Sequence, residues 1–386
     1  MTTIYWIRHG EAEGNLYRRC HGQYDSLITP NGREQLNALR ARFADIGIDA
    51  VYSSDLYRAW LTAHALASER GQPVTALSSF REIAMGIWED LTWIEIGRRW
   101  ERGYADFTSR PWKFSIKGGE SVAGACERAL SALYQVAARH PGQTVAVVSH
   151  GVVTRALMAR IRRLPETRMA DIPHGDNTSV SKLTFDGKEF GVEYYADNGH
   201  LLEGGLSTLA RQQWWRDKGG LDHGFWFRPV RFPSESELVE QYRSEAWMTI
   251  YGNLSNFSGP AFVEEARRVS ERDPGAVLFA INGERPAGML QIDYNSSIMY
   301  GAGHIAFLYL SPEYRGAGLG VQLLGQAVSA CRAKGCHSIA LRVYENNLRA
   351  VGFYKKYGFT QFGEEPSFGG KLMLMSIDIR IPAVTS

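Results

Sequence analysis

The sequence predicts an α/β protein of two domains. Its 386 residues exceed the usual size of one domain, and 44% of them are hydrophobic, which is enough to build packed cores. In the first half, apolar runs of strand length alternate with amphipathic segments of helix length, the pattern of a largely parallel sheet covered by helices. The periodicity lapses at 206–225, so we expect one domain at 1–205, a linker at 206–225 and a second domain at 226–386.

Three strand-and-helix pairs carry the prediction for the first half. The expected strands are Thr3–Ile7, Ala50–Ser53 and Thr144–Ser149, and the expected helices are 32–46, 56–68 and 152–163. In such sheets, ligands bind at the carboxyl ends of the strands. His9 and His150 both stand just after apolar strands, so we expect them to meet at this edge of the sheet.

The bulk properties exclude several classes of partner. The formal net charge is +2, both signs are spread along the chain, and no charged block suggests nucleic acid or a membrane surface. The N-terminus lacks a signal-like apolar stretch, and no run reaches the roughly 18 apolar residues that a membrane span needs. We therefore expect a cytoplasmic protein. The cysteines are too few for a disulfide framework, and we expect reduced thiols at Cys20, Cys126, Cys331 and Cys336.

Two short segments have the chemistry for handling phosphate. Arg8-His9-Gly10 offers a nucleophilic imidazole beside a fixed cation. The second segment follows the apolar run 305–310, offers bare backbone amides at a helix start, and reads Arg315-Gly316-Ala317-Gly318-Leu319-Gly320. The first suits covalent phosphoryl chemistry and the second suits binding a pyrophosphate, so the sequence indicates a fusion of two enzymes.

Further motifs follow Arg8-His9-Gly10 in order along the first half. They are Asn15, the segment Gly22–Gly32, Tyr52–Ala59 with Arg58, Phe80–Ile83 with Glu82, Gly118–Ser121 and Ser149–Gly151. Together these motifs resemble the histidine phosphatase, or phosphoglycerate mutase-like, superfamily over about residues 1–205. The resemblance implies a three-layer α/β/α domain.

The same resemblance implies a catalytic group of four side chains. His9 would attack phosphorus and form a phosphohistidine, while Arg8, Arg58 and His150 surround the transferred group. A neutral imidazole is a good nucleophile near neutral pH, and fixed cations stabilise the dispersed charge on the phosphoryl oxygens. Because the protein's own cations neutralise this charge, we expect no metal.

Neighbouring side chains receive roles from the resemblance as well. Glu82 would protonate the departing alkoxide and then take a proton from the attacking water. Asn15 would donate a hydrogen bond to the phosphoryl oxygens, and His21 beside Gly22 is a candidate for contact with the substrate.

A mutase is the nearest alternative within this superfamily. The residues after Glu82 read Ile-Ala-Met-Gly-Ile-Trp-Glu-Asp and lack the Arg and Tyr that follow the corresponding Glu in true phosphoglycerate mutases. The segment is instead similar to that of broad-specificity phosphatases. The sequence therefore favours a phosphomonoesterase, without naming its ester.

Other groups of the first half have two interpretations. Glu11 and Glu89 are carboxylates that could be mistaken for Glu82. Tryptophans interleaved with arginines at 88–112 could be mistaken for a surface that stacks nucleic-acid bases. We interpret these tryptophans as a wall over the phosphatase pocket, because insertions over such sheets commonly select the substrate.

The second half carries two motifs at the spacing of an acyltransferase. The first runs from Ile305 through the loop 315–320, and the second is Asn347–Phe359. Together they resemble the GNAT superfamily of acyl-CoA-dependent N-acyltransferases over about residues 226–386. The resemblance implies an α+β domain that uses acetyl-CoA.

This second resemblance implies cofactor contacts and one catalytic group. The loop 315–320 would bind the pyrophosphate of acetyl-CoA, and backbone groups of Leu308 and Leu310 would pair with the pantetheine arm. Asn347 would contact the cofactor, and Tyr354 would protonate the CoA thiolate as it leaves. The general base stays open among Glu313, Asp293 and His304.

The sequence therefore predicts a bifunctional enzyme that acts on small molecules. It would hydrolyse a phosphate ester and acetylate an amine with acetyl-CoA, and the fusion suggests one metabolite that bears both groups. In an alternative of another class, one domain only binds a ligand or scaffolds a dimer. The substrates and the oligomeric state, a homodimer included, stay open.

Overall fold

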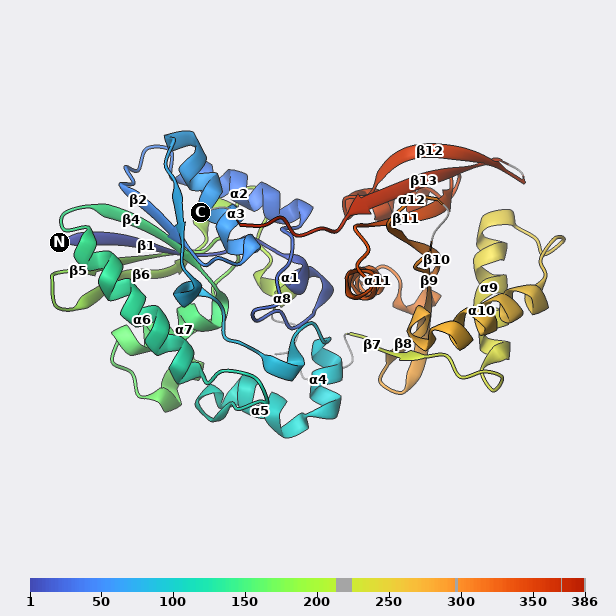
Figure 1. Cartoon of the computed structure of the whole chain (residues 1–386), viewed down its shortest axis with the longest axis horizontal. Helices are drawn as coiled ribbons and strands as arrows, with labels where there is room; N and C mark the ends of the chain where they lie inside the picture. Colours follow the sequence, from blue (N-terminus) through green and yellow to red (C-terminus); the bar gives the residue numbers. More distant parts are fainter. Residues whose placement is uncertain (213–223, 296–297, 369, 385–386) are drawn as a thin grey trace. The chain divides into compact units, whose positions relative to one another are not determined.

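The computed structural model describes residues 1–212, 224–295, 298–368 and 370–384. The chain divides into two compact units, Met1–Lys218 with Ile381–Ser386, and Gly219–Arg380. Each unit has its own sheet (Figure 1). Within the predicted linker 206–225, residues 213–223 lie outside the described residues, and Leu209–Gln212 form a short helix, α8.

The first unit is built on a six-stranded sheet in the order β3-β2-β4-β1-β5-β6. Its strands are β1 (Thr2–Arg8), β2 (Ala50–Ser53), β3 (Val74–Ala76), β4 (Thr144–Ser149), β5 (Val180–Phe185) and β6 (Phe190–Asp197). β3, β2, β4 and β1 pair in parallel, as the alternation of runs predicts. β5 and β6 add two antiparallel strands beside β1.

Helices cover both faces of this sheet, which gives three layers (Figure 1). The helices that precede β5 are α1 (Glu13–Tyr17), α2 (Pro30–Arg42), α3 (Tyr57–Ala67), α4 (Trp93–Arg99), α5 (Glu101–Ser109), α6 (Val122–Arg139) and α7 (Gly151–Ile161). α2 and α3 cover one face of the sheet, and α6 and α7 cover the other. Ile7 packs in a core with α2 and α3, whereas Trp6 packs in a core with α6 and α7. Successive residues of β1 thus face opposite layers, as the pleat of a strand requires.

Local sequence sets the ends of the helices. α2 begins after Thr29, whose side chain accepts a hydrogen bond from the backbone N–H of Gly32, and Pro30 suits its first position. The helix ends at Arg42 and not at the predicted residue 46. The chain turns at Phe43, which is thereby fully buried in the core.

The topology brings the two predicted catalytic segments together. β1 and β4 are parallel neighbours, and Arg8 is in register with Ser149 at their carboxyl ends. The next residues, His9 and His150, therefore leave the sheet side by side. This confirms the expectation that the two segments meet at one edge.

The second unit is built on a seven-stranded sheet in the order β12-β13-β11-β10-β9-β8-β7. Its strands are β7 (Trp226–Pro229), β8 (Val277–Asn282), β9 (Arg285–Asp293), β10 (Ala302–Leu310), β11 (Ser338–Tyr344), β12 (Thr360–Ser367) and β13 (Gly370–Asp378). β10 and β11 are parallel, and the other neighbours pair antiparallel.

Four helices of the second unit pack on this sheet, and the unit is α+β. They are α9 (Ser236–Tyr251), α10 (Gly259–Arg272), α11 (Val321–Ala333) and α12 (Leu348–Lys356). α9 and α10 share a core with Phe279 and Tyr309, whereas α11 shares one with Ala280 and Ala287 on the opposite face. The chain is thus a mixed α/β protein with two different sheets, as the sequence predicts.

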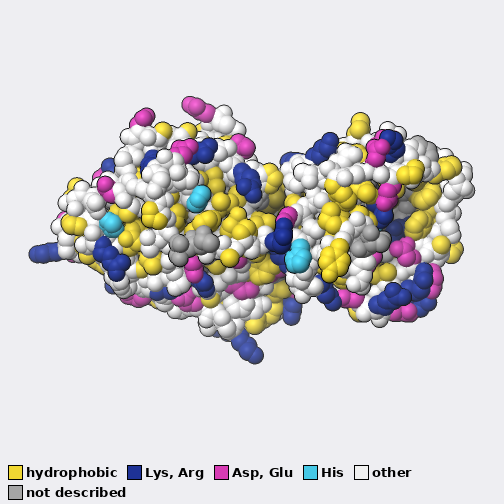
Figure 2. All heavy atoms as spheres, turned by 45° about the horizontal axis from the view of Figure 1, so that its top comes forward, with side chains coloured by type: hydrophobic (Ala, Val, Ile, Leu, Met, Phe, Trp, Pro, Cys, Tyr) yellow, Lys and Arg dark blue, Asp and Glu magenta, His cyan; other side chains and the backbone are white. Residues whose placement is uncertain are grey.

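The surface agrees with the mixed charge of the sequence. On the face drawn in Figure 2, basic and acidic side chains are interspersed. No helix in the described part of the chain is long and apolar enough to cross a membrane.

Candidate active sites

His9 follows β1, lines a cavity and is 6% exposed. Its Nδ1 lies 2.7 Å from the carbonyl oxygen of Gly10. Because a carbonyl can only accept, Nδ1 carries the proton and Nε2 keeps its lone pair. Burial first, then the charges of Arg58 and Arg8, hold the pKa of His9 well below its usual value of 6.5. The site therefore contains a neutral imidazole with a nucleophilic nitrogen.

His150 stands at the N-terminus of α7 and is fully buried. The centroid of its ring lies 5.1 Å from that of His9. Neither ring nitrogen of His150 has a hydrogen-bond partner among the described residues. Burial, followed by Arg58 and His9, lowers the pKa of His150 well below 6.5.

Arg8, the last residue of β1, also has an unsatisfied polar atom. Its Nη1 donates to the carbonyl oxygen of Gly175 at 2.6 Å, whereas its Nε is buried with no partner in the described residues. This nitrogen lies beside Gly151, the residue that follows His150: a Cβ added to Gly151 would be 3.4 Å from it. Buried polar atoms without partners are rare and call for an explanation. An oxyanion bound beside His9 would accept hydrogen bonds from this nitrogen and from the ring of His150.

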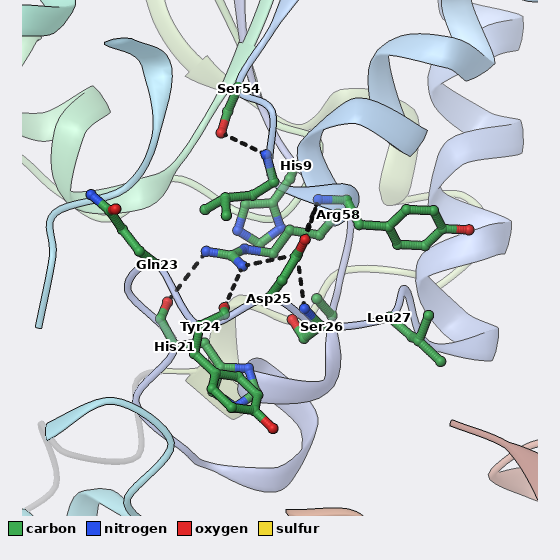
Figure 3. Close-up of polar contacts among 12 residues, drawn as sticks. His9, His21, Gln23, Tyr24, Asp25, Ser26, Leu27, Ser54 and Arg58 are labelled. Carbon is green, nitrogen blue, oxygen red and sulfur yellow. Dashed lines mark hydrogen bonds and ion pairs between the residues drawn. The ribbon is translucent and has the colours of Figure 1, made fainter. Parts of the chain in front are cut away.

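Arg58, on α3, is held by the loop that follows α1 (Figure 3). Its Nη1 donates to the carbonyl oxygen of Tyr24 at 2.9 Å, and its Nη2 donates to that of Gly22 at 2.6 Å. Asp25 lies 3.7 Å from the same guanidinium. Arg58 is 2% exposed, so backbone contacts fix this cation in a buried place near His9.

Glu82 lines the same cavity and is 8% exposed. Its carboxylate accepts hydrogen bonds from the backbone N–H groups of Val152 at 2.9 Å, Val153 at 3.1 Å and Ile83 at 2.9 Å. The first two donors belong to the first turn of α7, directly after His150. The unpaired amides of a helix N-terminus thus orient this carboxylate.

The two carboxylates that could be mistaken for Glu82 have other partners. Glu89 accepts hydrogen bonds from the backbone N–H groups of Gly22, Gln23, Tyr24 and Met85, at distances of 2.8–3.0 Å. It therefore ties the loop that holds Arg58 to the segment after Glu82, a part that sequence reasoning missed. Glu11 accepts hydrogen bonds from the side chains of Thr29 and Asn31.

The three predicted substrate-binding residues all line the cavity. The side-chain oxygen of Asn15 accepts from the backbone N–H of Ala12 at 3.1 Å. His21 lies 3.0 Å from Asp90 through its Nε2, and its pKa is lowered by burial. The N–H of Gly22 donates to Glu89. The structure thus brings Asn15, His21 and Gly22 to the same place as the catalytic candidates.

The cavity has a volume of about 180 Å³ and an aromatic wall. Trp93, Tyr104 and Phe107, from α4 and α5, form this wall. The rings of Trp93 and Phe107 stack with centroids 5.5 Å apart. Trp93 therefore agrees with the predicted wall, whereas Trp88 is fully buried in the core.

In the second unit, the candidate site lies where β10 and β11 diverge. The two strands pair from Ala302 with Ser338 to Ile305 with Leu341. They continue to Leu310 and Tyr344 with no further pairing between them among the described residues. Leu308 and Leu310 lie in this diverging part of β10, where backbone groups can pair with an extended ligand.

The glycine loop between β10 and α11 has the conformation that glycine allows. Gly316 has φ +83° and Gly318 has φ +72°, which other residues adopt at a cost. A Cβ at either position would meet no atom within 4 Å, so open space lies in front of this backbone. Ala317 is exposed, Leu319 packs in the core, and Gly320 precedes α11. Exposed backbone of this kind at the start of a helix is suited to the close approach of a phosphate group.

The hydrogen bonds and burial of three other predicted residues of this site are as follows. The Nε of Arg315 donates to the carbonyl oxygen of Leu310 at 2.6 Å, so this side chain turns back toward β10. Asn347 caps α12 by accepting from the backbone N–H of Ala350 at 3.2 Å. Tyr354 is 8% exposed, makes no hydrogen bond through its hydroxyl within the described residues, and has a pKa raised by burial.

The candidate bases differ in their distance from the diverging strands. His304 and Asp293 face each other in the register of β10 and β9, at the end where β10 is still paired with β11. Glu313 lies in the short turn after β10 and is exposed. Sequence reasoning missed Glu245, on α9, which accepts a hydrogen bond from the hydroxyl of Tyr309 in the diverging part of β10.

The first unit is thus a three-layer α/β/α domain with a histidine pair at the strand ends, and the second is an α+β domain with an open glycine loop. Two family models match the chain: "Histidine phosphatase superfamily (branch 1)" over residues 4–198 and "Acetyltransferase (GNAT) family" over residues 238–359. The chain belongs to the histidine phosphatase superfamily and is a fusion with a GNAT acetyltransferase domain.

Known proteins of both phosphatase and mutase-like description are similar to this chain. Phosphoglycerate mutase-like protein 4 of Arabidopsis thaliana is 32% identical over 206 residues, which covers 53% of this chain and 88% of that protein. Phosphoserine phosphatase 1 of Hydrogenobacter thermophilus is 32% identical over 157 residues, which covers 41% of this chain and 74% of that protein. The solved structure of Bacillus stearothermophilus YhfR has a TM-score of 0.51 at 34% identity, covering 52% of this chain and all of its own.

Proposed function

We propose that the chain is a bifunctional cytoplasmic enzyme. Its first unit hydrolyses a phosphate monoester through a phosphohistidine at His9, without a metal, and its second unit transfers an acetyl group from acetyl-CoA to an amine. The observation that carries the first activity is that buried nitrogens of Arg8 and His150, beside a neutral His9, have no hydrogen-bond partner within the described part of the chain. Donors held in this way stabilise a phosphoryl group without reorganising during the reaction.

Hydrolysis then takes two steps. In the first, which starts with Glu82 protonated, Nε2 of His9 forms a bond to phosphorus while the ester P–O bond breaks, and Glu82 gives the leaving oxygen its proton. In the second, Glu82 takes a proton from water, the water oxygen bonds to phosphorus and the P–N bond breaks. Inorganic phosphate leaves, and both His9 and Glu82 return to their starting states. Arg58, held by backbone oxygens, stabilises the charge on the phosphoryl oxygens in both steps.

The acetyl transfer would take place at the diverging part of β10. The amine nitrogen bonds to the acetyl carbon, the C–S bond breaks, and the hydroxyl of Tyr354 gives the CoA thiolate a proton. The nitrogen then loses its extra proton as it becomes an amide, and this proton restores the Tyr354 hydroxyl. Glu245 is the carboxylate best placed to take a proton from the incoming ammonium. It accepts hydrogen bonds from the hydroxyl of Tyr309, which lies between Leu308 and Leu310, and from the side chain of Gln241.

The alternative within the superfamily is phosphoglycerate mutase-like transfer. The segment after Glu82 lacks the Arg and Tyr of true mutases, which supports hydrolysis. The cavity has an aromatic wall of Trp93, Tyr104 and Phe107 and is also lined by Arg18, Arg19 and Arg155, so its lining alone does not separate the two reactions.

A screen of the purified full-length protein tests this proposal. Phosphorylated amines are offered with and without acetyl-CoA, and the release of inorganic phosphate and of free CoA thiol is measured. We expect both products, and a compound that yields both would support one shared metabolite. Isomerisation of a phosphoglycerate without net phosphate release would instead establish the mutase. Binding of acetyl-CoA with no thiol release from any amine would reduce the second unit to a ligand-binding module.

A further inference from the structure

A buried loop behind the catalytic segment holds the backbone of His9. This loop precedes β5 and contains Asp176 and Asn177, which are 1% and 0% exposed. The side-chain nitrogen of Asn177 donates to the carbonyl oxygen of His9 at 3.0 Å, and the N–H of Thr178 donates to the same oxygen at 3.2 Å. Two hydrogen bonds to its carbonyl oxygen thus hold the backbone of the nucleophile in place.

Asn177, together with the backbone of Ala12, orients the amide of Asn15. Its Nδ2 lies 3.3 Å from the side-chain oxygen of Asn15, which already accepts from the backbone N–H of Ala12 at 3.1 Å. Because two donors point at this oxygen, the amide nitrogen of Asn15 is the end left for the cavity. This amide nitrogen can donate a hydrogen bond to a phosphoryl oxygen bound in the cavity.

Thr208 orients Asn177 in turn, from a part of the chain beyond β6. Thr208 is fully buried, and its hydroxyl oxygen lies 2.9 Å from Oδ1 of Asp176 and 3.1 Å from Oδ1 of Asn177. The backbone N–H of Thr208 donates to the same Asp176 oxygen at 3.2 Å, and the hydroxyl of Ser207 donates to its other oxygen at 2.5 Å. With its oxygen facing Thr208, Asn177 must turn its nitrogen toward His9 and Asn15.

We propose that Thr208 is a positioning residue of the phosphatase site and acts through Asn177 on His9 and Asn15. Thr208 lies outside residues 4–198, which match the phosphatase family, and inside the segment that the sequence assigns to a linker. The segment that leads out of the first unit therefore completes the support of its catalytic loop. This inference rests on the proposed role of His9 as the nucleophile.

Removing the Thr208 hydroxyl should loosen the site without removing any group that touches substrate. Asn177 would keep its contacts with His9 and Asn15 but lose one of the contacts that hold its amide in place, so the His9 backbone and the Asn15 amide would be held less firmly. Binding of a phosphoryl group should weaken, and turnover should slow. Asp176 keeps its bonds from Ser207 and from the Thr208 backbone, so the loop retains most of its support.

The test compares Thr208→Val, which keeps the shape, with Thr208→Ser, which keeps the hydroxyl. Thr75→Val, at an exposed position on β3, is the matched control. Turnover of p-nitrophenyl phosphate, the affinity for inorganic phosphate by calorimetry and the melting temperature are measured on the full-length protein. We expect about a tenfold loss of kcat and of phosphate affinity in Thr208→Val. Thr208→Ser should stay within about threefold of the parent, and Thr75→Val should not change.

Two results would overturn the inference. One is a Thr208→Val protein with unchanged kcat and phosphate affinity but a lower melting temperature, because Thr208 would then only stabilise the fold. The other is equal loss in the serine and valine variants. Should Thr208→Val not fold, Thr208→Ala, which also removes the hydroxyl that contacts Asn177, provides the same comparison with Thr208→Ser. If the parent binds phosphate but hydrolyses no ester, the proposed function fails, while the phosphate affinities still decide the role of Thr208.

Discussion

The imidazole rings of His9 and His150 lie 5.1 Å apart, and neither nitrogen of His150 has a partner among the described residues. The parallel pairing of β1 with β4 creates this relationship, because Arg8 and Ser149 are in register at the strand ends. One ring has a defined tautomer through Gly10, and the other has both nitrogens unused. The pair therefore combines a nucleophile with a group that can donate to the phosphoryl oxygens it attacks.

His9→Ala should abolish ester hydrolysis and leave acetyl transfer intact. The side chain supplies the atom that bonds to phosphorus, so we expect a loss on the order of 10³-fold or more in phosphate release. Acetyl transfer by the same preparation is the control for folding, since the two units have separate cores. Phosphate release near the parent rate would exclude His9 as the nucleophile.

Glu82→Gln should have an effect that depends on the leaving group. An alkoxide needs a proton as it departs, so we expect a loss of about 10² to 10⁴-fold with alkyl phosphates. A nitrophenolate needs little protonation, and the loss with p-nitrophenyl phosphate should be much smaller. Rates of both substrates with the variant and the parent give the ratio. Equal losses would show that Glu82 only supports the structure.

Lower pH should destabilise the first unit through its buried histidines. Burial, then Arg42, lowers the pKa of His200 to about 4 from 6.5, and the pKa values of His9 and His150 are lowered too. Because these histidines have a lower pKa in the folded state than in the unfolded state, the unfolded state binds protons first as the pH falls. This proton binding favours unfolding. Stability is therefore present above about pH 6.5 and is lost as the pH falls toward the folded pKa values. The denaturant midpoint of unfolding should fall as the pH is lowered from about 7.5 to 5. It should fall less in His200→Gln than in the parent.

Much of the first site could be predicted from sequence because its residues adjoin regular elements. Apolar runs define β1 and β4, so His9 and His150 could be placed at the ends of neighbouring strands. Glu82 was recognisable from its motif, and the structure brings it to the first turn of α7. The glycine loop was similarly marked, because φ values of +83° and +72° need glycine at Gly316 and Gly318.

The supporting contacts could not be predicted, because they depend on how loops pack. Glu89 binds the backbone of 22–24, and no side-chain pattern marks an acceptor for backbone N–H groups. Thr208 and Asp176 are separated in sequence by β5 and β6, and they come into contact only because this hairpin brings the chain back beside the loop that precedes β5. Glu245 is on a helix without a motif, and its contact with Tyr309 depends on how α9 packs on β10.

Gly318→Val should weaken acetyl-CoA binding and spare hydrolysis. The residue has φ +72°, which costs a β-branched side chain strain, and the new methyl groups would enter the open space before the loop. We expect at least a tenfold loss of affinity by calorimetry. Gly252→Val, at the C-cap of α9, is the control for backbone strain, since Gly252 has φ +69° with open space around it and lies outside the loop. Unchanged affinity in Gly318→Val would refute the phosphate loop.

Tyr354→Phe should slow acetyl transfer while acetyl-CoA still binds. The change keeps the buried ring and removes only a hydroxyl that has no hydrogen bond among the described residues, so the fold should tolerate it. Burial raises the pKa of this hydroxyl, which keeps it protonated at neutral pH and able to give its proton to a thiolate.

We expect roughly a 10²-fold lower transfer rate for Tyr354→Phe, with the acetyl-CoA affinity within about twofold of the parent. Tyr300→Phe, at a fully exposed tyrosine of the same unit, is the matched control and should change neither quantity. Steady-state thiol release gives the rate and calorimetry gives the affinity. If the rate is unchanged, the thiolate takes its proton from elsewhere and Tyr354 serves only to pack α12 against β11. If the affinity falls with the rate, the hydroxyl holds the cofactor instead of protonating it.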